Sequence, residues 1–182
     1  IPSHGVARIP LYCAHLWHGR IAGRIEPDVI QVSPAAIRVD GAPIGLLAFG
    51  GAGQAALRFA AGAGQNGRNA GLALLYPGCE AMLPTEREQA SDQRAPVLLL
   101  HGDADPANLP ADCAALAERL AQSAPVLRQQ IAMAGYAWDR VPYRLQEEVA
   151  LRWPGRPGAH VRAGFLQEAA EYVAAQVEAF FT

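Results

Sequence analysis

The turn at residues 48–53, Ala-Phe-Gly-Gly-Ala-Gly, has a glycine spacing that phosphate-binding sites use. Gly51, Gly53 and Ala56 fit the G-x-G-x-x-A pattern of a dinucleotide-binding turn, which follows a strand and opens a helix. In such a turn the free N–H groups at the helix N-terminus hold a pyrophosphate. Glu80, which follows the next apolar run, would then bind the ribose. One interpretation is therefore a nucleotide-binding oxidoreductase domain.

The same turn also has the layout of a nucleophile elbow, a strained corner between a strand and a helix that exposes a catalytic side chain. Gly50 occupies the position of that side chain. Glycine adopts a strained backbone readily, but it has no atom with which to attack a substrate. A third interpretation is purely structural, because any parallel sheet needs tight glycine turns. The residues of this turn leave the three interpretations open.

Two later turns also carry side chains that could take part in catalysis. The apolar run at residues 97–100 leads into a turn with two carboxylates, Asp103 and Asp105. Either one could orient a catalytic base, and either one could simply cap the turn. Further on, residues 134–139 read Ala-Gly-Tyr-Ala-Trp-Asp and include Tyr136. A phenol has a pKa of about 10, so it is a poor general base near neutral pH.

Strands and helices that would position these turns alternate along the chain. Apolar runs that are continuous rather than alternating predict strands buried on both faces, as in a parallel sheet. We expect strands at residues 6–13, 44–49, 72–76, 96–100 and 125–133, and helices at residues 54–61, 111–122 and 165–181. The sequence thus predicts an α/β fold with a mostly parallel sheet of about five strands and helices on both faces. In such sheets, chemistry gathers at the carboxyl ends of the strands.

Length, composition and charge exclude several classes of protein. A chain of 182 residues with 51% hydrophobic and 18% charged residues fits one globular domain, predicted to span residues 1–182. The net charge of −2 gives no basic field for a phosphate backbone, so we expect no nucleic-acid partner. All 15 basic residues are arginines, which excludes a Schiff-base lysine. We expect no membrane segment, because no stretch approaches the apolar length that a span requires.

The cysteines and histidines give weak signals for metal sites or disulfides. Cys13, Cys79 and Cys113 are odd in number and widely spaced, which predicts free thiols and a cytoplasmic protein. His101 at a strand end, His160 near the C-terminus and the amino-terminal cluster His4, His15 and His18 do not form a recognisable ligand set. We therefore expect neither a metal nor another cofactor.

Several segments, in the same chain order, resemble the dienelactone hydrolase branch of the α/β-hydrolases. They are Ser3-His4-Gly5, the approach to the glycine corner at residues 38–49, Tyr76-Pro77-Gly78-Cys79, the strand and turn at residues 97–105, and the stretch at residues 134–139. The resemblance covers roughly residues 1–182. It implies acyl transfer on a small ester or lactone by a nucleophile, an acid and a histidine, in that order along the chain.

Matched position by position, the resemblance places Asp105 as the acid, Gly50 at the nucleophile position and Tyr136 at the histidine position. Gly51, Phe49 and Trp138 would lie against the substrate. Because both the nucleophile and the base are replaced, we expect little or no turnover by the usual mechanism. A non-catalytic binding module is the remaining alternative, and the sequence leaves homo-oligomerisation open.

The chain also begins later than the family pattern does. In α/β-hydrolases another strand lies between the one expected at residues 6–13 and the one that leads into the elbow. We expect that strand to be absent, which should leave a gap in the sheet. Another chain or a rearranged amino-terminal segment would fill this gap, or the sequence is only part of a longer protein.

Overall fold

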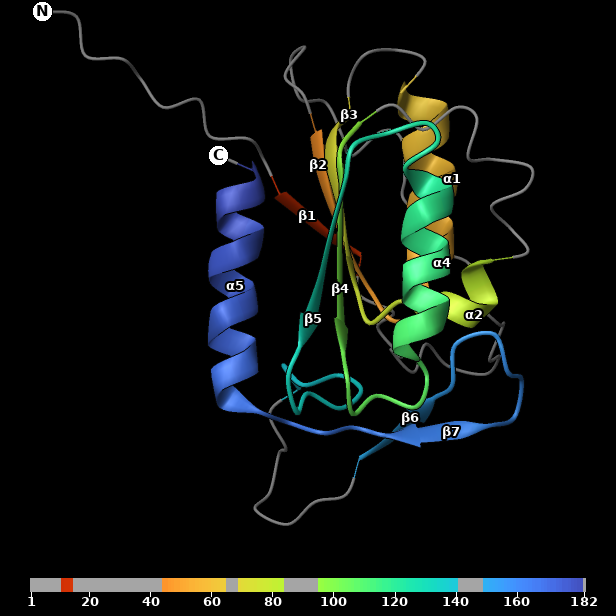
Figure 1. The fold of residues 1–182 in the computed structure, drawn as a ribbon, viewed down its shortest axis with the longest axis vertical. Coiled ribbons are helices and arrows are strands. Elements are labelled where there is room, and N and C mark those ends of the chain that lie inside the picture. The colour runs from red at the N-terminus through yellow and green to blue at the C-terminus, as the bar shows by residue number, and fades with distance from the viewer. Residues whose placement is uncertain (1–10, 15–43, 65–68, 84–94, 141–148, 182) are drawn as a thin grey trace, which may run out of the picture.

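Five strands form one parallel sheet in the computed structural model, which describes residues 11–14, 44–64, 69–83, 95–140 and 149–181 (Figure 1). The strand order follows the sequence, β1-β2-β3-β4-β5, and every neighbouring pair is parallel. The strands are β1 Leu11–Ala14, β2 Ile44–Phe49, β3 Asn69–Leu75, β4 Val97–Gly102 and β5 Val126–Ile131. This arrangement confirms the predicted α/β class.

Helices cover both faces of the sheet, as predicted. Helices α1 (Ala52–Gly64), α2 (Cys79–Met82) and α4 (Pro110–Leu120) lie on one side, and α5 (Gln167–Phe181) lies on the other (Figure 1). Within the described residues, no helix has both the length and the apolar character needed to cross a bilayer.

The two central strands have apolar side chains buried on both faces, which explains their continuous apolar runs. Alternate residues of β3 and β4 pack in opposite directions, because successive side chains of a strand point to opposite faces. Leu72, Leu74, Val97 and Leu99 pack with α1 and α4, whereas Ala73, Leu75, Leu98 and Leu100 pack with α5. None of these side chains is more than 3% exposed. The resulting double core holds the carboxyl ends of the strands in fixed positions.

Two features of the sheet region differ from the sequence-based expectation. Strand β1 pairs directly with β2, with Leu11 opposite Gly45, so the expected gap beside β2 does not exist. A two-stranded antiparallel hairpin, β6 (Ala150–Arg152) and β7 (His160–Arg162), was not predicted. Its turn is the segment rich in proline and glycine at residues 153–158, and Figure 1 shows the hairpin near the end of the sheet where β4 ends.

The prediction of free thiols is wrong for two of the three cysteines. Cys79 at the start of α2 and Cys113 in α4 form a disulfide with an S–S distance of 2.00 Å. Wide sequence spacing concealed this bond, because the fold brings α2 and α4 together on one face of the sheet. Disulfides are more common in oxidising compartments, so the cysteines no longer support a cytoplasmic location.

Candidate active site

Gly50 forms the sharp corner between β2 and α1. Its φ angle is +53°, in the left-handed region that glycine adopts without a steric penalty. The Gly50 N–H donates to the Leu75 carbonyl at 2.9 Å, and the Gly50 carbonyl accepts from the Gly53 N–H at 3.0 Å. These bonds tie the corner to the neighbouring strand β3 and to the first turn of α1. The backbone of a tight strand-to-helix corner is therefore present, as the elbow interpretation predicted.

Tyr136 fills the space in which a side chain at Gly50 would lie. A Cβ atom added at Gly50 would collide with the Tyr136 hydroxyl oxygen and would lie 3.4 Å from Tyr136 Cζ. The two positions at which the chain departs from the hydrolase pattern are thus in direct contact. A small residue at one position compensates sterically for a large residue at the other.

The Tyr136 ring is held firmly in this place. Its backbone carbonyl accepts a hydrogen bond from the Gly164 N–H at 2.7 Å, and its ring packs edge-to-face with Tyr76 at a centroid distance of 5.1 Å. Burial raises the pKa of Tyr136, and the nearby carboxylates of Asp105 and Asp139 raise it further. The phenol consequently stays protonated at neutral pH and cannot serve as a general base.

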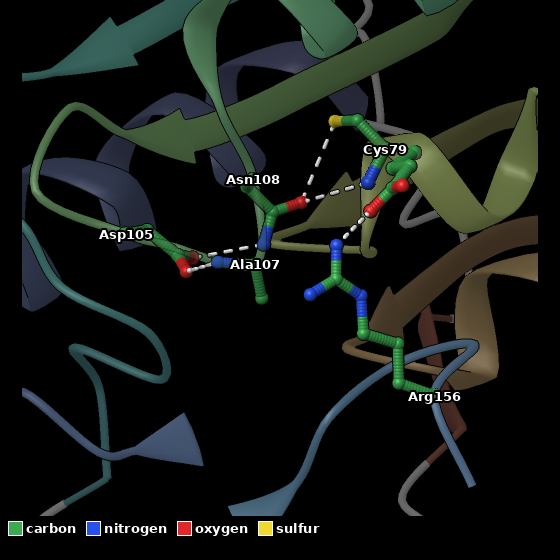
Figure 2. Close-up of polar contacts among 6 residues, drawn as sticks. Cys79, Asp105, Ala107, Asn108 and Arg156 are labelled. Carbon is green, nitrogen blue, oxygen red and sulfur yellow. Dashed lines mark hydrogen bonds and ion pairs between the residues drawn. The ribbon is translucent and has the colours of Figure 1, made fainter. Parts of the chain in front are cut away.

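Asp105 lies in the turn after β4, where it is 1% exposed. Its Oδ1 accepts from the Ala107 N–H at 2.8 Å, and its Oδ2 accepts from Asn108 Nδ2 at 2.8 Å (Figure 2). Burial raises the pKa of Asp105, and the hydrogen bonds from Ala107 and Asn108 oppose that shift. The Asp105 carboxylate also raises the pKa of Tyr136, so the residues predicted at the acid and histidine positions influence each other electrostatically.

Asp103, the alternative acid, has a different role. It is exposed, and its Oδ1 accepts from the Met133 N–H at 2.6 Å. Met133 has a φ angle of +60° in the turn after β5. Asp103 therefore stabilises the backbone between the ends of β4 and β5, which corresponds to the turn-capping role considered from the sequence.

Tyr76 and Asp139 form a contact that the sequence analysis did not predict. The Tyr76 hydroxyl donates to Asp139 Oδ1 at 2.7 Å, across 63 residues of sequence. The Tyr76 ring also packs edge-to-face with Trp138 at 4.8 Å. Burial raises the pKa of Tyr76, and the Asp139 carboxylate adds to this shift. Sequence signals for the pair were limited to the position of Tyr76 at the end of a predicted strand and of Asp139 in the stretch at residues 134–139.

The residues expected to contact substrate differ in accessibility. Gly51 is exposed, and a Cβ atom added there would meet no other atom within 4 Å. Phe49 is half-buried at the end of β2. Trp138 is fully buried, and its indole Nε1 has no hydrogen-bond partner. Open space thus exists beside Gly51, whereas Trp138 belongs to the hydrophobic core on the α5 side of the sheet.

The histidines within the described residues do not contact Asp105. His101 is buried, where its Nε2 accepts from Arg128 Nη1 at 2.9 Å and its Nδ1 lies 3.4 Å from the Gly102 carbonyl. His160 is exposed on β7. His4, His15 and His18, together with the aromatic residues Trp17 and Tyr143, lie outside the described residues.

The dinucleotide interpretation does not fit the structure. Gly53 is buried, and a Cβ atom there would lie 2.9 Å from Pro77 Cβ and 3.3 Å from Met82 Sδ. A pyrophosphate could not approach this glycine, because protein side chains already cover it. Glu80 forms an exposed ion pair with Arg156 at 2.6 Å in the first turn of α2. Gly53 therefore serves close packing against the β3–α2 turn, and the turn does not fit phosphate binding.

No protein-family model matches the sequence, and a search of the curated proteins also finds no match. Solved structures do match. One is a dienelactone hydrolase-like promiscuous phosphotriesterase from metagenomic libraries, with a TM-score of 0.56 and 19% identity, covering 78% of this chain and 53% of the other. Another, from Klebsiella pneumoniae, is assigned to the dienelactone hydrolases. It matches with a TM-score of 0.50 and 18% identity, over 76% of this chain and 51% of the other.

These similarities establish the fold. The chain spans about half the length of the structures that it matches, so the activity of those proteins does not transfer to it directly. The chain therefore has an α/β-hydrolase-like fold, similar to that of dienelactone hydrolase-like proteins.

Proposed function

We propose that this chain is an ester- or lactone-hydrolase-like protein in which the Tyr136 side chain fills the place of the nucleophile. It would bind small carbonyl compounds but would not hydrolyse them by a catalytic triad. The observation that carries this proposal is the position of the Tyr136 hydroxyl in the space of the missing side chain at Gly50. Hydrolysis through an acyl-enzyme needs a nucleophile and a base. Here the first is absent, and the second is a phenol whose pKa is raised by burial.

Three groups are proposed to remain available to a ligand. The backbone at Gly51 is exposed beside open space, the half-buried ring of Phe49 offers an apolar wall, and the Tyr136 hydroxyl is a hydrogen-bond donor at the buried end. A neutral phenol can donate to a carbonyl oxygen. This set supports a small ester or lactone as the ligand. A location in the cytoplasm and the oligomeric state remain predictions from the sequence.

Hydrolysis of a short-chain aryl ester tests the proposal. The parent protein, Gly50→Ser alone and Tyr136→His alone should show no saturable turnover. The serine would collide with Tyr136 in the first variant, and the nucleophile is missing in the second. Gly50→Ser combined with Tyr136→His should regain partial activity, and Gly50→Ala combined with Tyr136→His is the matched control without a nucleophile. Saturable hydrolysis by the parent protein would refute the proposal.

Binding without turnover needs a separate measurement. Titration with a small lactone, followed by the chemical shifts of the Gly51 and Tyr136 amides, should show saturable changes with no loss of the lactone. Shifts confined to residues away from this corner would show that the ligand class or the site is wrong.

A further inference from the structure

Asn108 uses both ends of its buried carboxamide to join two turns at the carboxyl end of the sheet. Its Nδ2 donates to Asp105 Oδ2 at 2.8 Å. Its Oδ1 accepts from the Gly78 N–H at 2.7 Å and from the Cys79 N–H at 3.2 Å. Figure 2 shows the Asn108 side chain between Asp105 and Cys79. One side chain therefore connects the turn after β4 with the turn between β3 and α2.

The surroundings of Asn108 leave the carboxamide little freedom to move. The Cys79–Cys113 disulfide lies against the same oxygen, with Asn108 Oδ1 at 3.4 Å from Cys79 Sγ and at 4.0 Å from Cys113 Sγ. A disulfide sulfur has no proton to donate, so these contacts are packing contacts. Asn108 is itself fully buried, at 0% exposure. The amide group is thus fixed by hydrogen bonds at both ends and by the disulfide beside it.

We propose that Asn108 is a positioning residue, which fixes the Asp105 carboxylate relative to the β3–α2 turn and favours its ionised form. An N–H donor stabilises the charged form of a carboxylate, and a buried carboxylate without such partners is costly. Among the residues that the structure describes, the titratable group that interacts electrostatically with Asp105 is Tyr136, from the segment after β5. The two cysteines beside Asn108 do not titrate, because they are bonded to each other. Asn108 has this role whether or not the site turns over a substrate.

Two substitutions separate the two ends of the carboxamide. Asn108→Leu removes both the donor to Asp105 and the acceptor for the Gly78 and Cys79 amides. Asn108→Asp keeps an acceptor oxygen for these amides but replaces the donor with a second carboxyl group. Gln54→Leu is the matched control, because Gln54 Nε2 also holds α2, through a 2.8 Å bond to the Ala81 carbonyl, and has no bond to Asp105.

The test follows the carboxyl carbon of Asp105 by NMR during a pH titration, together with hydrogen exchange of the Gly78 and Cys79 amides. Both Asn108 variants should titrate Asp105 at a higher pH than the parent protein. The two amides should exchange faster in Asn108→Leu but keep their protection in Asn108→Asp. Gln54→Leu should leave the Asp105 titration unchanged.

Each alternative result has a definite meaning. If Asn108→Leu does not fold, the titration of Asn108→Asp decides the question. An Asp105 titration that is unchanged in the folded Asn108 variants, or that moves equally in Gln54→Leu, would overturn the positioning role. Loss of ester-hydrolase activity plays no part in this test, so its failure is distinguishable from failure of the proposed function.

Discussion

The acid turn and the nucleophile corner lie at the same end of the sheet but are stabilised in different ways. In the acid turn, both oxygens of Asp105 accept hydrogen bonds, from Ala107 and from Asn108. At the corner, Gly50 has no side chain, and the Tyr136 hydroxyl fills the vacant space. A buried carboxylate requires polar partners, whereas a lost nucleophile leaves only a volume to fill. The acid turn is therefore held by hydrogen bonds, whereas the corner is held by packing.

The largest expected effect concerns the covalent bond beside the acid turn. Replacing both Cys79 and Cys113 with alanine should lower the free energy of unfolding by about 3–4 kcal/mol, because the disulfide restricts the unfolded chain. The bond closes a loop with a sequence separation of 34 residues. Chemical denaturation would measure the loss. A dithiol reductant should lower the stability of the parent protein but not that of the double variant. Equal losses of stability in the two proteins would show that the disulfide is not stabilising.

The next effect tests the steric compensation at the corner. Gly50→Ala should cost about 1–3 kcal/mol of stability, because the new methyl group meets the Tyr136 hydroxyl in a packed core. The cost should be smaller in a Tyr136→Phe background, which lacks this oxygen. A double-mutant cycle from denaturation curves measures the coupling. Additive costs would show that the two positions do not compensate for each other. Part of the cost will remain in both backgrounds because φ at residue 50 is positive.

A pH-dependent effect is expected from His101, next to the acid turn. Burial lowers the pKa of His101 from its ordinary value of 6.5. The unfolded chain then binds a proton near that pH while the folded protein does not, so stability should fall as the pH drops through this value. His101→Gln should flatten the stability profile between about pH 7.5 and 5.5, as measured by denaturation. An unchanged slope would mean that folding does not change the pKa of His101.

The smallest effect is expected at the exposed ion pair between Glu80 and Arg156. Their side chains are 59% and 52% exposed, respectively. Glu80→Gln should therefore change the free energy of unfolding by less than about 0.5 kcal/mol, because water screens such pairs. Thermal denaturation at low and high salt would detect the change. A loss comparable to that of the disulfide variant would show that the hairpin contact with α2 contributes more than its exposure suggests.

Local sequence patterns predicted the strands and helices better than they predicted the contacts between them. The strands β2 and β4 and the helix α4 were expected within two residues of their observed ends, because apolar runs and helical spacing are local signals. The amphipathic helix at residues 165–181 was also expected. However, two of the large apolar residues in this range, Phe165 and Tyr172, are 40% and 48% exposed. Periodicity shows which face of a helix is apolar, but it does not show how much of that face the rest of the protein covers.

Contacts between distant segments escaped the sequence analysis. The Cys79–Cys113 disulfide and the Tyr76–Asp139 hydrogen bond join residues separated by 34 and 63 positions. Asn108 belongs to no sequence motif. Its role in joining two turns follows only from its hydrogen bonds in the folded protein. These contacts depend on side-chain direction at the ends of neighbouring strands. Residue types and spacing do not specify that direction.

The sequence by itself determined a parallel α/β sheet and the place of a glycine corner after β2, with a glycine at residue 50 and a tyrosine at residue 136. Each follows from residue identity or from local periodicity. Only the tertiary structure decided that Tyr136 occupies the space beside Gly50, that Asp105 is buried while Asp103 is exposed, and that Asn108 joins two turns. The physical reason is that these contacts arise from packing between elements, where shape and burial select one of several partners that the sequence allows.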